Sequence, residues 1–264
     1  MDTTPERNTP VYSLHGKKIL VIGIANDKSI AWGCAKAYRA LGAELAITYL
    51  NPKAETYVRP LAERLDAPII SKLDVTREGD MEATFEEIRS KWGRLDGLLH
   101  SIAFAPGADL HGRVIDCSRE GFLQAMDVSC HSFIRAAKLA EDLMQGGGSI
   151  QTLSYLGADR VVDNYNLMGA AKAALESVAR YLAAELGSKG ITVNAISPGP
   201  LATRAASGIG HFDELLDKAA KRAPTGRLTT IDEVGSLSAF LMSQIAPSTT
   251  GDLFYVDGGY NIMA

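Results

Sequence analysis

The chain alternates, over almost its whole length, between short apolar runs rich in β-branched residues and longer stretches in which apolar residues recur at helical spacing. This alternation favours a parallel sheet with helices on both faces, because parallel strands need crossover connections and each right-handed crossover covers one face. We therefore predict an α/β fold built on a doubly wound, seven-stranded parallel sheet. The expected strands are residues 17–23, 43–50, 68–75, 95–103, 149–155, 191–198 and 252–256, and the expected helices are residues 30–41, 53–65, 78–92, 119–144, 164–187 and 231–243.

One domain accounts for the chain. Its 264 residues are 46% apolar, which is enough for a large core, and single α/β domains commonly reach this size. We expect residues 1–15 to form a polar tail and residues 16–264 to form one Rossmann-type catalytic domain. The segment of about residues 200–227 is too long for an ordinary strand-to-helix loop and contains a short helical pattern at 213–222. It follows the sixth expected strand, where a substrate lid would lie.

The charge balance restricts the partners. The net charge of −4 and the pI of about 5.8 argue against nucleic acid or an anionic membrane surface as the main partner, since both require a basic surface. The N-terminal residues lack the apolar core of a secretory signal, and no apolar run is long enough to span a membrane, so we expect a cytoplasmic protein. The cysteines and histidines show no metal-ligand spacing, so we predict no metal site.

The first expected strand runs into a turn that suits a nucleotide. Gly23 at the strand end permits a tight turn, and Ser29 and Ile30 lie where the next helix begins. Small residues and a hydroxyl at this position let backbone amides approach a pyrophosphate at the helix N-terminus. The pattern is a loose variant of the dinucleotide-binding fingerprint, and taken alone it also fits a plain turn.

Three further strand ends are expected to contact the cofactor. Leu50 ends the second expected strand, where an acid would normally bind the adenosine 2′-hydroxyl. That acid is missing, as is an arginine pair for a 2′-phosphate, and we favour NADH over NADPH. Asp74 and Val75 close the third strand, where Asp74 either accepts a hydrogen bond from adenine or caps a helix. Ser101 and Ile102 close the fourth strand and would place backbone near the ribose and the nicotinamide.

Two tyrosines and a lysine form the expected catalytic group. Tyr165 and Lys172 lie in the stretch 164–187, which we expect to be one helix, so that both side chains project from the same face. Tyr155 ends the fifth expected strand. In a hydride-transfer reaction, Lys172 would bind a ribose and a phenol would donate a hydrogen bond to a substrate carbonyl oxygen. The alternative is a buried tyrosine–lysine pair with a structural role only.

Further motifs surround these residues and extend along nearly the whole chain. Through them the chain resembles the short-chain dehydrogenase/reductase superfamily and, within it, the bacterial enoyl-acyl-carrier-protein reductases of fatty-acid synthesis. The motifs are Gly23 with Ser29-Ile30-Ala31, HSIAFAPG at 100–107, LSYLG at 153–157, NYNLMG at 164–169 with Lys172, NAIS at 194–197, AASGI at 205–209 and VDGG at 256–259.

The spacing of tyrosine and lysine departs from that of ordinary ketone-reducing members, whose lysine follows the tyrosine by four residues. Here that position is Gly169, and the lysine is Lys172. In a ketone the carbon that accepts hydride bears the oxygen, whereas in a 2-enoyl thioester the oxygen lies two carbons away. The resemblance therefore implies reduction of the C2–C3 double bond of a trans-2-enoyl thioester by NADH. Tyr165 would donate to the thioester oxygen, Lys172 would bind the nicotinamide ribose, and Tyr155 would support them.

The resemblance also implies contacts around the pocket. Leu201 and Thr203 would contact the cofactor, Ala105 would contact the substrate, and the enzyme would be a homotetramer. The segment 201–227 carries five basic and three acidic residues, so it either forms a mildly basic lid that meets an acidic acyl carrier protein or is a solvated helix face. Two rival interpretations stay open. One is a short-chain dehydrogenase that acts on ketones or alcohols, and the other is a nucleotide-sensing protein that keeps the fold without catalysis.

Overall fold

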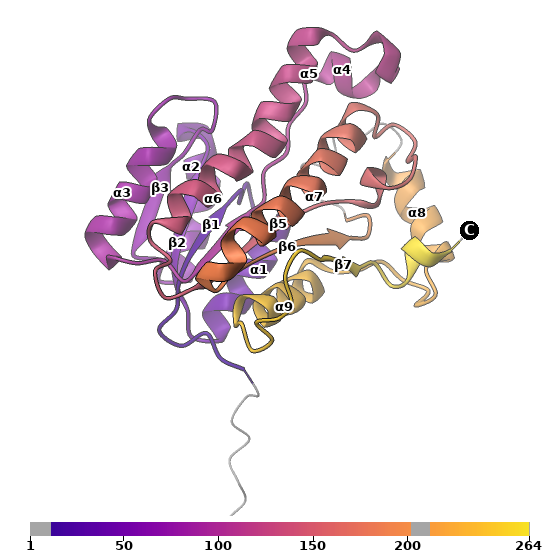
Figure 1. Ribbon diagram of the computed structural model, residues 1–264. Helices are drawn as coiled ribbons and strands as arrows, with labels where there is room; N and C mark the ends of the chain where they lie inside the picture. Colours follow the sequence, from indigo (N-terminus) through magenta and orange to yellow (C-terminus); the bar gives the residue numbers. More distant parts are fainter. Residues whose placement is uncertain (1–11, 202–211, 264) are drawn as a thin grey trace, which may run out of the picture.

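A sheet of parallel strands in the order β3-β2-β1-β4-β5-β6-β7 forms the centre of the molecule (Figure 1). The computed structural model describes residues 12–201 and 212–263, with the backbone only for residues 212–215. The predicted doubly wound, seven-stranded sheet is confirmed. The strands are β1 Lys18–Ile22, β2 Glu44–Tyr49, β3 Ile69–Lys72, β4 Gly97–His100, β5 Gly148–Leu153, β6 Ile191–Pro198 and β7 Leu253–Val256.

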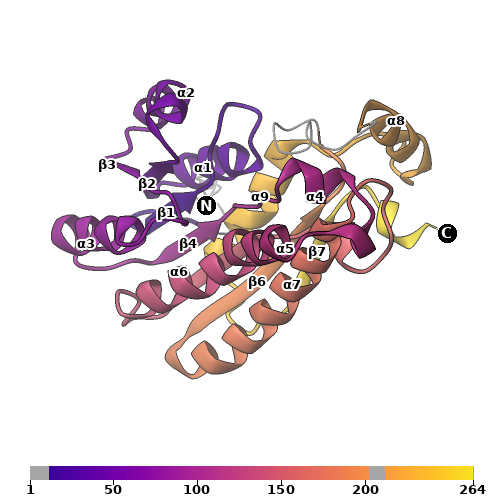
Figure 2. The ribbon, with the colours of Figure 1, turned by 90° about the horizontal axis from the view of Figure 1, so that it is seen from above.

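Helices cover both faces of the sheet, as the alternation predicts (Figure 2). The α-helices are α1 Ile30–Ala40, α2 Pro52–Arg64, α3 Asp80–Trp92, α4 Gly107–His111, α5 Arg119–Met126, α6 Ser132–Glu141, α7 Leu167–Leu186, α8 Phe212–Arg222 and α9 Ile231–Met242. Helices α1, α2 and α9 pack on one face of the sheet, and α3, α6 and α7 pack on the other. The shorter elements are a π-helical segment, η2 Asp127–His131, and the 3₁₀ turns η1 Val114–Asp116, η3 Leu156–Ala158, η4 Gly187–Lys189 and η6 Tyr260–Ile262.

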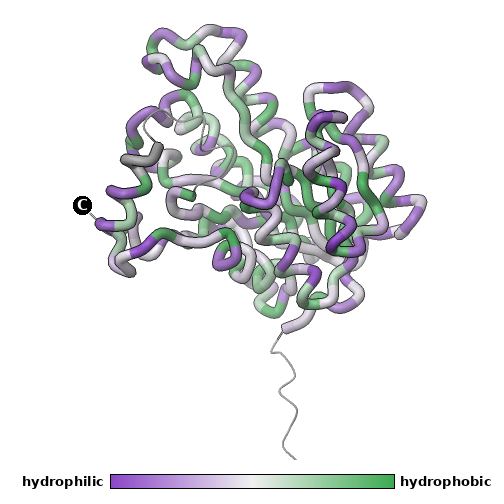
Figure 3. Tube along the Cα trace, turned by 180° about the vertical axis from the view of Figure 1, so that it is seen from behind, coloured by the Kyte–Doolittle hydropathy of each residue, from purple (hydrophilic) through white to green (hydrophobic). Residues whose placement is uncertain are grey.

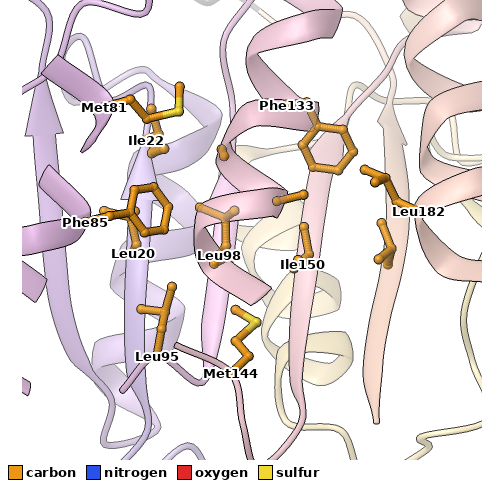
Figure 4. Close-up of a cluster of buried hydrophobic side chains, with 14 of the residues drawn as sticks. Leu20, Ile22, Met81, Phe85, Leu95, Leu98, Phe133, Met144, Ile150 and Leu182 are labelled. Carbon is orange, nitrogen blue, oxygen red and sulfur yellow. The ribbon is translucent and has the colours of Figure 1, made fainter. Parts of the chain in front are cut away.

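Alternate residues of each central strand enter opposite cores. In β1, Leu20 and Ile22 contact the layer of α3, α6 and α7, which Figure 4 shows, while Ile19 and Val21 contact the other layer. Because both faces are covered, these strands are buried along most of their length: β1 is apolar from Ile19 to Ile22, whereas β5 and β6 also bury polar side chains such as Gln151 and Asn194. The hydropathy of the trace shows the same arrangement, with apolar segments inside and hydrophilic positions at the outer turns (Figure 3).

Local sequence explains two helix ends. Gly42 follows α1 with φ +97°, the left-handed conformation that ends a helix. Thr230 and Glu233 form a capping box at the start of α9. Residues 12–15 are not a free extension of the tail: Leu14 is fully buried, and its amide donates to Leu41 O at 3.0 Å. The packed domain therefore includes these residues.

The predicted helix 164–187 is wrong at its start. α7 begins at Leu167, and Tyr165 lies in the turn before it, between Asn164 with φ +62° and Asn166 with φ +42°. A right-handed helix cannot contain such φ values, and asparagine tolerates them better than most residues. Tyr165 therefore reaches the site from a turn, and its separation from Lys172 is not a distance along one helix.

The ends of three other elements differ by a few residues from the predicted ones. The predicted helix 119–144 is α5, η2 and α6 in direct succession from Arg119 to Glu141. The predicted strands at 95–103 and 149–155 end at His100 and Leu153, so Ser101 and Tyr155 lie in the loops that follow.

The segment between α5 and α6, η2, is π-helical and packs against α7. π-Helical segments occur frequently at functional sites.

Helices α1 and α9 cross at two glycines, and this contact gives a stability prediction. A Cβ on Gly33 would lie 2.2 Å from Ile231 O, and one on Gly235 would lie 2.4 Å from Gly33 O. Backbone atoms cannot move away as side chains do, so we expect Gly33→Ala to lower the free energy of unfolding by about 3 kcal/mol, or the midpoint by about 6–12 °C. Thermal unfolding followed by circular dichroism measures this shift.

Gly187→Ala is the matched control. Gly187 has the helical φ of −58°, and no atom lies within 4 Å of the position of its Cβ. The same added methyl group is expected to leave the midpoint unchanged or raise it slightly. Equal midpoints for Gly33→Ala and wild type would contradict the close helix contact.

Candidate active site

A cavity of about 320 Å³ opens at the carboxyl ends of the central strands. The strand order reverses between β1 and β4, and in such sheets ligands bind at this switch point. The cavity is bordered by the start of α1, by the loops after β4, β5 and β6, and by the start of α7. The predicted residues that line it are Ile30, Ser101, Ile102, Ala105, Tyr155, Tyr165, Lys172 and Leu201.

The turn after β1 is shaped by close backbone packing. Gly23 has φ +111°, and a Cβ there would lie 2.0 Å from Ser101 O, so only glycine fits. The Ser29 hydroxyl accepts hydrogen bonds from the amides of Ala25 and Asn26 at 3.0 and 3.1 Å. Ser29 thus holds the turn in shape immediately before α1, where Trp32 and Gly33 donate to Ser29 O and the amides of Ile30 and Ala31 precede the first helical hydrogen bond. This is the arrangement in which a helix N-terminus binds a phosphate.

The two tyrosines pack directly against each other. Their ring centroids lie 4.9 Å apart with an interplanar angle of 65°, an edge-to-face contact. Burial raises the pKa of both phenols, with Tyr260 adding to the effect on Tyr155 and Tyr155 adding to the effect on Tyr165. The Tyr155 hydroxyl is buried and has no hydrogen-bond partner among the described residues. Both phenols therefore stay protonated at neutral pH and can act as hydrogen-bond donors.

Lys172 lies on the first turns of α7 and is 5% exposed. Its Nζ donates to Leu153 O at 2.6 Å, which uses one of three ammonium donors. Burial lowers its pKa from 10.5 to about 8, and Glu176 and Cys130 act in the opposite direction. Lys172 is therefore held at the cavity wall with donors left for a ligand.

His100, at the end of β4, is a core side chain. It is fully buried, with Nε2 2.8 Å from Ser132 Oγ. Burial, reinforced by the charge of Lys172, lowers its pKa to about 3, so the imidazole is neutral at physiological pH. A neutral ring in a closed network positions β4 rather than transferring protons.

The residues predicted for the adenine side lie at neighbouring strand ends outside this cavity. Leu50 follows β2 and is half exposed, and Asp74 and Val75 follow β3, which pairs with β2. Asp74 does not cap α3, whose N-cap is Gly79; its carboxylate accepts from the amide and hydroxyl of Thr76. Thr203 and the AASGI motif at 205–209 lie outside the described residues.

The structure adds residues that the sequence analysis missed. Ser154 lines the cavity between Leu153 and Tyr155, and its hydroxyl donates to the carboxylate of Glu176. Leu110 and Met168 add apolar walls. The position of Glu176, four residues after Lys172, was a sequence signal, because side chains at this spacing lie on one helix face. Nothing in the sequence placed Leu110 near Met168, since α4 and α7 meet only in the folded chain.

A doubly wound sheet with a nucleotide-binding turn and a tyrosine–lysine pocket at its switch point defines the class, which is that of the nicotinamide-dependent short-chain dehydrogenases/reductases. Comparison with known proteins gives the family. A family model described as Enoyl-(Acyl carrier protein) reductase matches residues 23–261. The chain belongs to this family, and both the predicted family and the predicted oxidoreductase class are confirmed.

Individual relatives are similar over their whole length. The enoyl-[acyl-carrier-protein] reductase [NADH] FabI of Nostoc is 48% identical over 254 residues, which are 95% of this chain and 98% of the relative. The same enzyme of Rickettsia conorii is 46% identical over 250 residues, 95% of this chain and 96% of the relative.

Solved structures agree with these sequence relatives. The reductase from Anaplasma phagocytophilum, crystallised with NAD, has a TM-score of 0.92 at 45% identity, covering 96% of this chain and 97% of that one. The Bacillus cereus reductase, crystallised with NADP⁺ and an indole naphthyridinone, has a TM-score of 0.93 at 44% identity, covering 96% and 100%. Within the described ranges of this chain, no helix is both long and apolar enough to cross a membrane.

Proposed function

We propose that this chain uses NADH to reduce the C2–C3 double bond of trans-2-enoyl thioesters carried on an acyl carrier protein, in fatty-acid elongation. The observation that carries the proposal is the pair of buried phenols beside Lys172, with the Tyr155 hydroxyl unpartnered among the described residues. A buried polar group without a partner is costly, and the Tyr155 hydroxyl belongs to a residue that lines the cavity, where a bound ligand could accept its hydrogen bond. The relatives named above are NADH-dependent reductases of this substrate class, which supports the same assignment here.

The residues present fit a nicotinamide dinucleotide. Gly23, Ser29 and the N-terminus of α1 suit the pyrophosphate, and Leu50, Asp74 and Val75 suit the adenosine half. Ser101, Ile102 and Lys172 would hold the nicotinamide ribose end, and Leu201 would close it. When bound, NADH supplies the hydride that C3 of the substrate accepts.

The protein's own groups stabilise the charge that develops on the substrate. As C3 gains hydride, negative charge moves to the thioester oxygen, and Tyr165 donates a hydrogen bond to that oxygen. Tyr165 remains protonated because burial raises its pKa, so it stabilises the enolate as a donor, and a proton from water completes C2. Tyr155 supports this ring through its edge-to-face contact.

The rest of the cavity binds and shields the acyl chain. Phe104 and Ala105 form one wall, and Leu110 and Met168 form another. An apolar lining with few polar groups binds a hydrocarbon chain and excludes water from the reacting atoms. Ala105 is buried and offers its backbone to the substrate.

A steady-state assay tests the proposal. The purified protein is incubated with NADH or NADPH and either C4–C16 trans-2-enoyl thioesters or a panel of ketones, and oxidation of the nicotinamide is followed by absorbance. We expect turnover of enoyl thioesters with NADH. Turnover of ketones alone would establish the dehydrogenase alternative, and tight NADH binding without turnover of any substrate would establish the sensing alternative.

A basic hollow beside the cavity supports the carrier-bound form of the substrate. This hollow of about 600 Å³ is lined by Arg160, Lys218, Lys221 and Arg222, with Asp163 as the acid on its wall. It adjoins the tyrosine cavity, because Leu156 lines the hollow and Tyr155 lines the cavity. Figure 1 shows α8, which carries three of the four cations, beside the C-terminal segment. Excess positive charge favours an acidic carrier.

The double variant Lys218→Gln/Lys221→Gln tests this role. We expect its KM for the carrier-bound substrate to rise about tenfold, since each lost charge pair contributes about 0.5–1 kcal/mol, while KM for the coenzyme A thioester stays near wild type. Arg222 is left in place because it donates to Met263 O at 2.9 Å. Lys138→Gln, an exposed change on α6, is the control. An equal KM rise for both substrates would contradict carrier docking.

The remaining partner predictions concern assembly and location. We propose a homotetramer, supported by exposed apolar side chains along α5, α6 and α7, which are Phe122, Leu123, Ile134 and Tyr181. Light scattering that gives the mass of one chain would refute it. We also propose a cytoplasmic location, where the nicotinamide and carrier substrates are made; fractionation of the source cells tests it.

A further inference from the structure

The end of strand β5 binds both Lys172 and a nearby carboxylate on the same helix, that of Glu176. Glu176 follows Lys172 by one turn of α7, so the two side chains lie on one face of the helix. Lys172 Nζ donates to Leu153 O at 2.6 Å, and the hydroxyl of the next residue, Ser154, donates to Glu176 Oε1. The next residue is Tyr155, which lines the cavity. Leu153 thus binds the Lys172 ammonium, Ser154 binds the Glu176 carboxylate, and both are adjacent in sequence to the tyrosine of the site.

Glu176 is the carboxylate whose charge favours the protonated form of Lys172. Lys172 faces His100 from β4 and Cys130 from η2, and neither is a carboxylate. Burial lowers the pKa of Lys172 to about 8, and Glu176 is the largest of the groups that oppose this. An isolated buried ammonium loses its proton readily unless an opposite charge lies nearby.

Glu176 in turn is held from several sides. Burial raises its pKa, and Asp159 acts in the same direction, while the Ser154 hydroxyl, Arg180 and Lys172 favour its ionised form. Tyr255 of β7 and Tyr165 also sense its charge, because Glu176 is among the causes that raise their pKa values. The charge of the Glu176 carboxylate therefore acts on groups at the cavity, Lys172 and Tyr165, and on Tyr255 of β7.

We infer that Glu176, held by Ser154, is a positioning residue that supplies the counter-charge to Lys172 and keeps its ammonium protonated and aimed at the cofactor ribose. This inference rests on the proposed role of Lys172 in NADH binding. Glu176 is not among the residues that line the cavity, so its effect passes through Lys172 and through the Leu153–Tyr155 segment.

The test measures NADH affinity against pH, which requires no enoyl substrate. NADH fluorescence titrations from about pH 6 to pH 10 give the dissociation constant, whose alkaline rise in wild type is expected near pH 8, where Lys172 loses its proton. In Glu176→Gln, which keeps an acceptor for Ser154 but removes the charge, the midpoint is expected to fall by about one pH unit. Glu176→Asp retains the charge and is expected to restore the midpoint toward wild type.

Two further variants complete the design. Glu185→Gln makes the same charge change at an exposed position of α7 and is expected to match wild type. Ser154→Ala removes one hydroxyl, keeps the chain packed and is expected to lower the midpoint by less than Glu176→Gln does. It serves as the test if the Gln variant does not fold.

The inference is overturned if neither Glu176→Gln nor Ser154→Ala moves the midpoint, if Glu185→Gln moves it as far, or if wild type shows no alkaline limb. These results differ from a failure of the proposed function. A protein that binds NADH with the expected pH profile but reduces no enoyl thioester would refute the proposed reaction and leave the role of Glu176 standing.

Discussion

Tyr165→Phe is expected to lower kcat for enoyl thioester reduction by about 100-fold, the effect of removing one donor to a developing oxyanion. NADH affinity should stay close to wild type, because the phenol serves the substrate oxygen and not the ribose. The ring remains, and its packing against Gly157 and Tyr155 is kept, so the fold is not expected to change. Single-turnover kinetics with saturating NADH, together with a fluorescence titration of NADH, separate these two effects.

Tyr155→Phe is the matched control, since it removes the same atom from the neighbouring ring. Its effect on kcat is expected to be smaller, and its unfolding midpoint is expected to rise, because the deleted hydroxyl is buried without a partner among the described residues. An unchanged kcat in Tyr165→Phe, or an equal loss in both variants, would contradict the assignment of Tyr165 as the oxygen donor.

Lys172→Met is expected to raise the NADH dissociation constant about 10–100-fold, since hydrogen bonds from a charged donor contribute about 1.5–3 kcal/mol. Methionine fills a similar volume without a donor. Calorimetric titration of NADH into both proteins measures the change. A dissociation constant equal to that of wild type would remove the ribose role of Lys172.

The unfolding temperature of Lys172→Met shows whether its loss of NADH affinity comes from the site alone or from a destabilised fold. The pKa of Lys172 falls from 10.5 to about 8 on folding, so the unfolded chain binds the proton more tightly. The cost of burying this charge is fully present below pH 8, and stability from this group is gained as pH rises from about 8 toward 10.5. At pH 7, Lys172→Met is therefore expected to unfold at or above the wild-type temperature despite its weaker NADH binding.

The fold was predictable because its signal is repeated along the chain. Each central strand places apolar residues in two cores, as β1 does with Leu20 and Val21, and the strands alternate with helical patterns along the chain. The helix end at Gly42 and the helix cap at Thr230 also follow from local sequence, since each depends on neighbouring residues only.

The start of α7 was not predictable in the same way. The turn at Asn164 and Asn166 is fixed by tertiary packing: a Cβ on Gly157 would lie 2.3 Å from the Tyr165 ring, so that ring occupies the space which the glycine leaves. The pairing of Tyr155 with Tyr165 depends on the same packing. Helical periodicity alone extends through residue 164 and places Tyr165 on the wrong element.

The candidate site was predictable in its residue types more than in its supporting contacts. The predicted residues Tyr155, Tyr165 and Lys172 line one cavity, whereas the contact between Ser154 and Glu176 joins a loop to a helix and has no local signature. The roles assigned to these residues, and to the adenine-side residues Leu50 and Asp74, stay predictions.

The position of the transferred hydride tests the central claim most directly. Reduction of a trans-2-enoyl thioester with NADH deuterated at C4, followed by NMR or mass spectrometry of the product, locates the label. Our account predicts deuterium at C3 and a solvent proton at C2, because the charge left by hydride addition resides on the thioester oxygen beside Tyr165. Deuterium at C2, or at C1 of an aldehyde or alcohol product, would contradict it.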